Sequence, residues 1–199
     1  MKQSNLNLEG NKISLRMLRL SDFWNVYKNI RDEEVGKWTG PDTHSMLKNT
    51  FIQFLCRLLR HLQKGLRLLW DTLRPPKMQK VFRLGIVLRE TQKVIGIVTL
   101  SRSESESQCA EVGFWIGKKY WGHGLTTETV KIAIEFGFNT LALEKIVAWT
   151  FEKNVSSKKV LEKCGFKSDG VVEAAYLKYN EMQNRLNYRI LKSEYKSLY

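Results

Sequence analysis

The chain has 199 residues, 43% of them hydrophobic, and a formal net charge of +13. This length supports one sizeable core but not two comfortable domains, so we expect residues 1–199 to form a single domain. The first residues contain no apolar run of signal-peptide length, and no stretch approaches the roughly 18 uninterrupted apolar residues of a membrane span. We therefore expect a cytoplasmic protein with no membrane partner.

The chain has three cysteines, Cys56, Cys109 and Cys164, which lie far apart in the sequence. They show no metal-ligand spacing with the three histidines. We expect buried free thiols in a reducing compartment, with neither a disulfide framework nor a metal site.

The first part of the chain predicts one strand and one helix. Residues 12–19 (KISLRMLR) are typical of a strand, and residues 21–32 (SDFWNVYKNIRD) of a helix. Ser21 and Asp22 are expected to open this helix, because their side chains can cap free backbone amides.

Residues 42–80 form a basic segment with a helical pattern. Apolar residues recur at steps of three and four, at Phe51, Leu55, Leu58, Leu62, Leu66 and Leu69. Basic residues follow the same spacing on the opposite side, at Arg57, Arg60, Lys64 and Arg67. This pattern predicts an amphipathic helix with a basic back. Such a back is either a solvated face or a surface that contacts a ribosome or another polyanion.

The second part of the chain alternates between strands and helices. Residues 81–90 and 93–103 predict a hairpin joined by Thr91 and Gln92. Strands are expected at 110–117 and 145–151, helices at 126–139 and 154–164, and two further strands around the turn at 179–182. This order predicts an α/β (α+β) sandwich with a mixed sheet.

The stretch YWGHGLTTE, residues 120–128, places two glycines between a predicted strand and a predicted helix. The first amides of a helix have no partner inside it and carry a partial positive charge. A loop with few side chains lets a phosphate approach them, although Gly122 and Gly124 are equally suited to a tight turn. No Lys-Ser or Lys-Thr pair follows the glycines, and the third glycine of the dinucleotide fingerprint is absent. We expect His123 to be a solvated side chain and not a catalyst.

Two runs carry a family resemblance: AEVGFWIGKKYWGHGLTTETVKIAIEFGF and VAWTFEKNVSSKKVLEKCGFKSDG. They resemble the GNAT acetyltransferases, and within them the branch of ribosomal-protein alanine N-acetyltransferases. The resemblance implies a mixed, mostly antiparallel, splayed central sheet flanked by helices, with acetyl-CoA as co-substrate. It implies cofactor contacts from the preceding strand, the loop and one asparagine across the splay: Phe114, Trp115, Ile116, Trp121, Gly122, His123, Gly124, Leu125, Thr126, Thr127 and Asn154.

The sequence departs from the family pattern at three places. Trp121 stands where Gln or Arg is frequent in the loop. Leu161 occupies the place of a tyrosine general acid seven residues after the asparagine, which excludes a tyrosine acid there. Asn184 replaces an aspartate four residues before Tyr188, which leaves the choice of acceptor open.

Two side chains are candidates for the chemistry of amine attack on a thioester. Glu111 is expected to act as the base, on one strand face with Gly113 and Trp115. Ser157 is the nearest hydroxyl candidate for the general acid, in the absence of the tyrosine. Their rival interpretations are an edge-strand surface glutamate and a first-turn helix serine. A peptide α-amino group, with a pKa near ~8, needs only a modest base.

The resemblance implies acetyl transfer to a primary amine, with the N-terminal α-amino group of a protein such as a ribosomal protein as the expected acceptor. One alternative is an acetyltransferase for a small-molecule amine or antibiotic. Another is a basic ribosome- or nucleic-acid-binding module with a vestigial CoA site, which would use the basic side of segment 42–80. The family implies a monomer or homodimer, and places acceptor recognition in segment 42–80.

Overall fold

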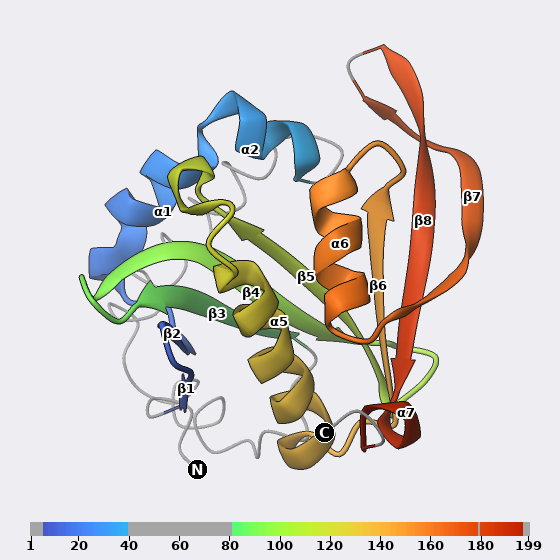
Figure 1. The fold of residues 1–199 in the computed structure, drawn as a ribbon, viewed down its shortest axis with the longest axis horizontal. Helices are drawn as coiled ribbons and strands as arrows, with labels where there is room; N and C mark the ends of the chain where they lie inside the picture. The colour runs from blue at the N-terminus through green and yellow to red at the C-terminus, as the bar shows by residue number, and fades with distance from the viewer. Residues whose placement is uncertain (1–5, 40–80, 179, 197–199) are drawn as a thin grey trace, which may run out of the picture.

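The computed structural model describes residues 6–39, 81–178 and 180–196. Within these ranges eight strands form one sheet, in the spatial order β1-β2-β3-β4-β5-β6-β8-β7 (Figure 1). All neighbours are antiparallel except β5 and β6, which are parallel. The strands are β1 (Asn7–Glu9), β2 (Ile13–Met17), β3 (Val81–Leu88), β4 (Lys93–Arg102), β5 (Cys109–Ile116), β6 (Lys145–Phe151), β7 (Lys167–Lys178) and β8 (Glu181–Leu191). The predicted mixed, mostly antiparallel sheet is confirmed, and β1 is a strand that the sequence pattern missed.

The helices flank this sheet. They are α1 (Phe23–Ile30), α2 (Glu33–Trp38), α5 (Leu125–Glu135), α6 (Val155–Lys163) and α7 (Lys192–Lys196), with short 3₁₀ turns η2 (Leu20–Asp22) and η4 (Lys118–Tyr120). A π-helical turn, η5 (Phe136–Thr140), continues α5, so the predicted helix 126–139 is confirmed with a widened last turn. The predicted apolar stripe of this helix is buried throughout, at Val130, Ile134, Phe138 and Leu141.

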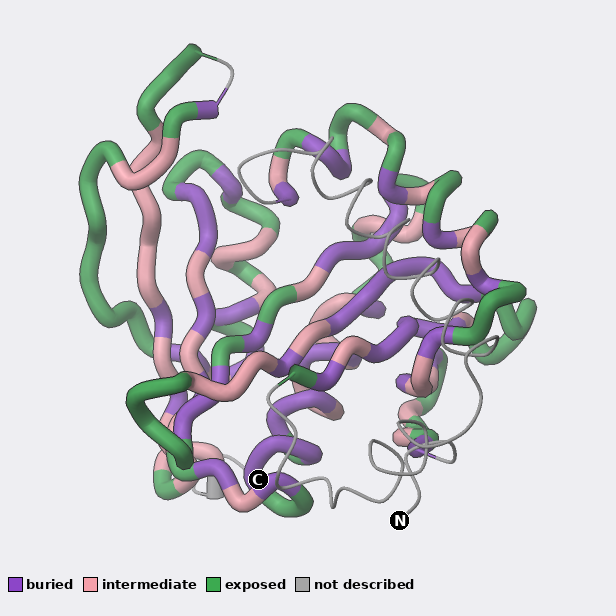
Figure 2. The backbone as a smooth tube through the Cα atoms, turned by 180° about the vertical axis from the view of Figure 1, so that it is seen from behind, coloured by how far each residue is buried: buried purple, intermediate pink, exposed green. Residues whose placement is uncertain are grey.

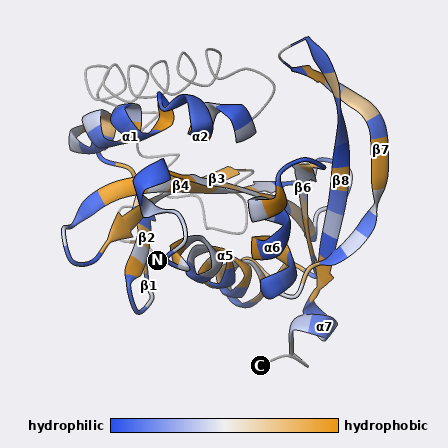
Figure 3. Cartoon of the chain, turned by 45° about the horizontal axis from the view of Figure 1, so that its top comes forward, coloured by the Kyte–Doolittle hydropathy of each residue, from blue (hydrophilic) through white to orange (hydrophobic). Residues whose placement is uncertain are grey.

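The two faces of the sheet have separate apolar clusters. On one face, Val26 and Ile30 of α1 and Val35 of α2 pack against β3, β4 and Trp115 of β5. On the other face, α5 and α6 pack against a larger cluster that includes Val112 and Ile116 of β5. We call these the α1 face and the α5 face; Figure 3 shows the two sets of helices on opposite sides of the strands. The predicted alternation along β5 is therefore confirmed.

The outer hairpin of β7 and β8 lies at one end of the sheet. Most residues of β7 are exposed, whereas the central strands are largely buried (Figure 2). The predicted hairpin around 179–182 is confirmed by the pairing of Lys178 with Glu181. This end of the molecule therefore has a solvent-facing wall next to β6.

The predicted helix over residues 21–32 is confirmed at Phe23–Ile30, but its start differs from the prediction. The 3₁₀ turn η2 precedes α1, and the Asp22 side chain belongs to the capping box of η2 but makes no capping bond to α1. Its carboxylate instead accepts hydrogen bonds from Arg16, at 2.7 and 2.9 Å, and from the amide of Arg19 at 2.7 Å. Both carboxylate oxygens of Asp22 are thus engaged by the Arg16 guanidinium and the Arg19 amide, and neither bonds an amide of α1. Asp32 is the residue that caps a helix, through Glu34 N at 3.0 Å.

The two cysteines in the described ranges, Cys109 and Cys164, are buried and free. Burial raises the pKa of the Cys164 thiol to about 12, so it is an unreactive core residue. Cys56 and the basic segment 42–80, with Arg57, Arg60, Lys64 and Arg67, lie outside the described residues. No helix in the described ranges is long and apolar enough to cross a membrane.

Candidate active site at the splayed strands

Strands β5 and β6 separate after three residue pairs. Their parallel register runs from Cys109 opposite Lys145 to Glu111 opposite Val147. Beyond this point no pairing joins β5 to another described strand on that side, whereas β6 stays paired with β8 and β5 with β4. The main chain of residues 112–116 therefore borders an opening in the sheet, as the resemblance predicts. An extended ligand can pair with such an edge as an added strand.

The glycine loop lies between the end of β5 and the start of α5. Gly122 and Gly124 have φ values of +79° and +75°, a region that glycine adopts without steric cost. A Cβ added at either position would meet no atom within 4 Å, so both residues face open space. Gly124 is the N-cap of α5, and no side chain caps this end among the described residues. The first amides of α5 are thus presented to the open space, which is the arrangement that binds anions.

The tryptophan of the loop has a structural contact of its own. Trp121 Nε1 donates a hydrogen bond to the carbonyl of Ile116 at 2.9 Å, and its ring packs against both apolar clusters. This bond fixes the loop against the end of β5. It also occupies one of the main-chain groups that the resemblance assigns to the cofactor, while the side chains of Trp115 and Ile116 are themselves buried.

Asn154 lies across the opening, at the start of α6. Its Oδ1 accepts a hydrogen bond from Ser157 N at 3.1 Å, so it caps α6. Its side-chain amide donates no hydrogen bond to any other described residue. The residue is 8% exposed, and it follows the end of β6 directly, on the β6 side of the opening. Ser157 is a partly buried residue of the first turn, and His123 is exposed as expected.

Glu111 lies on the α1 face at the point where the strands separate. Its Oε1 accepts a hydrogen bond from the indole Nε1 of Trp149 on β6, at 3.2 Å. The side chain is otherwise exposed, so a carboxylate oxygen is available at the opening. Leu161, in the place of a tyrosine acid, is fully buried and provides no polar group.

Trp149 belongs to an aromatic cluster that the sequence analysis did not identify. Its ring stacks on Tyr176 of β7 at 5.2 Å and meets Phe151 of β6 edge-on at 5.5 Å. Lys178 of β7 lies 5.3 Å from the Phe151 ring and donates hydrogen bonds to the carbonyls of Gly36 and Thr39 at the end of α2. The cluster therefore forms a wall that connects the outer hairpin to α2. The period-two alternation of β6 was the only sequence signal for it, because β7 contributes through tertiary packing.

Asn184 and Tyr188, the late departure from the family pattern, take structural roles. Asn184 Nδ2 donates to Glu152 at 2.9 Å, and its Oδ1 accepts from the amide of Ala174 at 3.0 Å. Tyr188 is 4% exposed, and burial together with the nearby Glu162 raises the pKa of its phenol. Asn184 thus ties β8 to the end of β6 and to β7.

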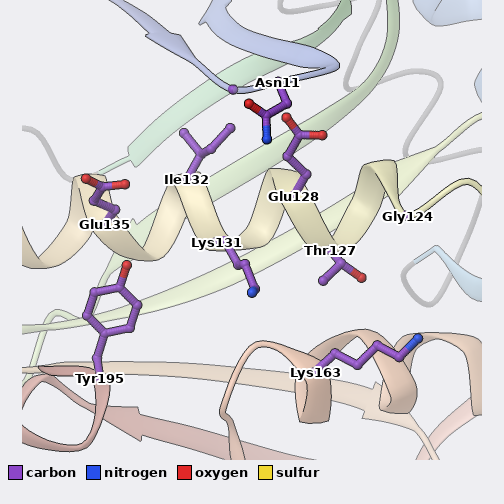
Figure 4. Close-up of a pocket in the computed structure, with 10 residues that line it drawn as sticks. Asn11, Gly124, Thr127, Glu128, Lys131, Ile132, Glu135, Lys163 and Tyr195 are labelled. Atoms are coloured by element: carbon purple, nitrogen blue, oxygen red, sulfur yellow. The ribbon is translucent and has the colours of Figure 1, made fainter. Parts of the chain in front are cut away.

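A groove of about 570 Å³ runs along the outer side of α5 from the loop (Figure 4). Gly124 and Thr127 line its loop end, and Lys131 and Lys163 add positive charge further along. Glu128 and Glu135 line the groove as well, and Glu128 also accepts a hydrogen bond from the amide of Lys12 at 2.9 Å. The groove therefore carries charges of both signs, two lysines and two glutamates. Among the described residues no cluster of His, Cys, Asp or Glu is arranged to hold a metal ion.

Comparison with known proteins gives the family. The model of the acetyltransferase (GNAT) domain matches residues 12–167. An uncharacterized N-acetyltransferase p20 of Bacillus licheniformis is 32% identical over 117 residues, which are 57% of this chain and 64% of that protein. The chain thus spans just under two thirds of the length of this relative. The chain belongs to the GNAT acetyltransferases, as the resemblance predicted.

Solved structures share the fold. The ribosomal-protein-S5-alanine acetyltransferase from Vibrio fischeri matches with a TM-score of 0.74 at 19% identity, over 96% of this chain and 99% of that one. The spermidine N-acetyltransferase from Vibrio cholerae, in complex with CoA and spermine, matches with a TM-score of 0.70 at 17% identity, over 94% and 99%. At these identities the likeness concerns the fold alone.

Proposed function

We propose that this protein transfers an acetyl group from acetyl-CoA to the N-terminal α-amino group of a protein, such as a ribosomal protein. The observation that carries the proposal is the open glycine loop at the uncapped start of α5, beside an unpaired strand edge. The proposal treats residues 1–199 as one catalytic domain. The cytoplasmic location expected from the sequence stays a prediction.

The residues present fit the co-substrate. Gly122 and Gly124 leave room for a pyrophosphate in front of the first amides of α5. The edge of residues 112–116 borders the opening on one side and Asn154 follows β6 on the other, which suits the amide-rich pantetheine arm. The groove beyond Thr127 offers room to the nucleotide end, with Lys131 and Lys163 as candidate partners for its phosphates.

The thioester of acetyl-CoA supplies an activated acetyl carbon. The amine nitrogen attacks this carbon, the new C–N bond forms and the C–S bond breaks, and the thiolate takes a proton from solvent. Glu111 accepts the proton of the amine, directly or through a water, because its carboxylate is exposed beside the opening. Trp149 holds this carboxylate in place through its indole N–H. Ser157 is the proposed hydroxyl that hydrogen-bonds to the thiolate leaving group.

Two of the solved structures with this fold carry the names of a ribosomal-protein and a spermidine acetyltransferase, and we weigh these two acceptor classes against each other. The net charge of +13 favours the first, because a strongly basic protein repels a polycation at long range. A ribosome is a polyanion, and the same charge favours an encounter with it. A small amine stays the alternative acceptor.

The first test is thermal unfolding with and without acetyl-CoA at low and high salt. A ligand at about 100 times its Kd adds about 2.7 kcal/mol, which corresponds to a rise of roughly 5–10 °C for a chain of this size. Release of free thiol is then measured with peptides that begin with Ala or Ser, with spermidine and with an aminoglycoside. No thermal shift at saturating ligand would exclude the co-substrate, and thiol release with small amines alone would favour the alternative acceptor.

The second test replaces the proposed base. Glu111→Gln keeps the size of the side chain and its contact with Trp149 but cannot accept a proton. We expect kcat/KM for the peptide to fall about 100-fold, with the residual activity rising at higher pH as the ammonium loses its proton to solvent. Glu90→Gln, an exposed glutamate at the β3–β4 turn, is the control and should behave as the wild type. An unchanged pH profile of Glu111→Gln would eliminate the assignment.

A further inference from the structure

We propose that Arg185 of β8 selects the acceptor by binding an oxygen atom close to its amine, the backbone carbonyl of the first peptide residue. This inference rests on the proposed function and specifies its acceptor. The residue lies against Trp149 of the aromatic cluster and not in the glycine loop.

The strand register places Arg185 on the α1 face. Arg185 pairs with Phe151 of β6, and Asn187, two residues further along β8, pairs with Trp149. Directly opposite residues in a sheet point to the same face, and so do residues two apart in one strand. Glu111 shares this face because it lies beside Val147 in the parallel register. The side chains of Glu111, Trp149 and Arg185 therefore come from three successive strands, β5, β6 and β8, on one side of the sheet.

The guanidinium of Arg185 has no anionic partner among the described residues. It makes no hydrogen bond or ion pair with them, its Nε is buried without a hydrogen-bond partner, and its Cζ lies 5.8 Å from the centre of the Trp149 ring. Arg189, four residues further along β8 on the same face, pairs with Asp169 and Glu194. A partly buried cation with unused donors loses water without regaining hydrogen bonds, which is unfavourable unless a ligand supplies oxygen atoms.

One indole ring connects this cation to the proposed base. Trp149 donates its N–H to Glu111, and the Arg185 guanidinium lies over the same ring. An acceptor with its amine at Glu111 thus carries its next polar atoms toward Arg185. A peptide N-terminus has its carbonyl oxygen two bonds from the carbon that bears the amine, so it provides a hydrogen-bond acceptor in this direction. A polyamine would instead bring a second ammonium toward the guanidinium, and like charges in a partly buried site repel.

The experiment compares acceptors in Arg185→Gln and Arg185→Lys. The probes are a peptide amide that begins with alanine (the Ala-peptide), free alanine, propylamine and spermidine. The constants kcat and KM are measured from the release of thiol. We expect the KM for the Ala-peptide to rise about tenfold or more in Arg185→Gln, with less change in kcat, because the peptide carbonyl loses a charge-assisted hydrogen bond. Spermidine and propylamine should be unaffected or improved. Arg185→Lys keeps the charge but not the fork, so we expect an intermediate KM.

Lys93→Gln, which removes one exposed positive charge at the start of β4, is the charge-matched control and should leave every probe unchanged. An equal loss for peptide and spermidine, or an unchanged peptide KM, would overturn the inference. A loss confined to free alanine would show that the guanidinium binds a carboxylate and not the peptide carbonyl, which also overturns it as stated. Thermal stabilisation by acetyl-CoA is measured in the same variants. It separates this failure from failure of the proposed function, because Arg185 lies on β8 and the proposed co-substrate site is at the glycine loop.

Discussion

Gly124→Ala is expected to weaken acetyl-CoA binding at least tenfold and to reduce kcat/KM by the same factor. The added methyl group would stand in the open space before the first amides of α5, where the pyrophosphate is proposed to lie. Loss of one charge-assisted hydrogen bond costs about 1.5–3 kcal/mol, and about 1.4 kcal/mol already corresponds to a factor of ten. The measurement is the Kd for CoA from calorimetry, together with the thermal shift at saturating ligand.

The alanine also carries a conformational cost, which a second variant controls. An L-residue in the left-handed region costs about 1–2 kcal/mol, so the melting temperature should fall by a few degrees. Gly170→Ala has the same kind of strain, since Gly170 has φ +102° and open space for a Cβ, but it lies in β7 away from the loop. We expect Gly170→Ala to lose similar stability and to keep CoA binding. Equal CoA affinities in the two variants would contradict the phosphate site.

Asp22→Asn is expected to destabilise the fold by about 3 kcal/mol, the cost of breaking a buried ion pair from one side. The side chains of Asp22 and Arg16 are 7% and 15% exposed, and the pair is bidentate. The neutral side-chain amide in the variant would leave the partly buried Arg16 guanidinium without its counter-charge. A loss of this size lowers the melting temperature by roughly 6–12 °C in a chain of this length. Thermal unfolding without ligand measures it.

The same pair predicts a pH dependence. Burial by itself raises the pKa of Asp22, but hydrogen bonds from Arg16 and from the amide of Arg19 lower it by more, so the net pKa lies below its ordinary value. A carboxyl with a lowered folded pKa stabilises the fold above its unfolded pKa, near ~4, and loses this contribution as the pH falls through the folded value. The stability difference between wild type and Asp22→Asn should be constant from neutral pH to about pH 5 and shrink below about pH 4. Glu9→Gln, at an exposed pair with Arg89, should cost below about 1 kcal/mol and serves as control. A difference that grows toward acid pH would contradict the assignment.

Local sequence determined the glycine loop and the elements around it. Glycines at 122 and 124 directly before an amphipathic run require a bare helix start, and the structure has them at positive φ with α5 beginning at Leu125. Period-two runs such as 81–90 and 93–103 determined the β3–β4 hairpin in the same way, because their pairing depends on neighbouring residues. The family pattern added the splay between β5 and β6, which residue propensities alone do not contain.

Tertiary structure decided what the side chains on the α1 face contact. The alternation of β6 gave Trp149 a face, but only folding brings its indole to Glu111 from 38 residues away and places Arg185 over it. In the same way Asp22 was predicted to cap a helix from its local position, and Arg16 on β2 took its carboxylate instead. Backbone requirements such as a positive φ or a helix start depend on a few adjacent residues, and so can be predicted from the local sequence. The partner of a charged or aromatic side chain depends on the register of strands distant in the sequence, and is fixed only when the sheet assembles.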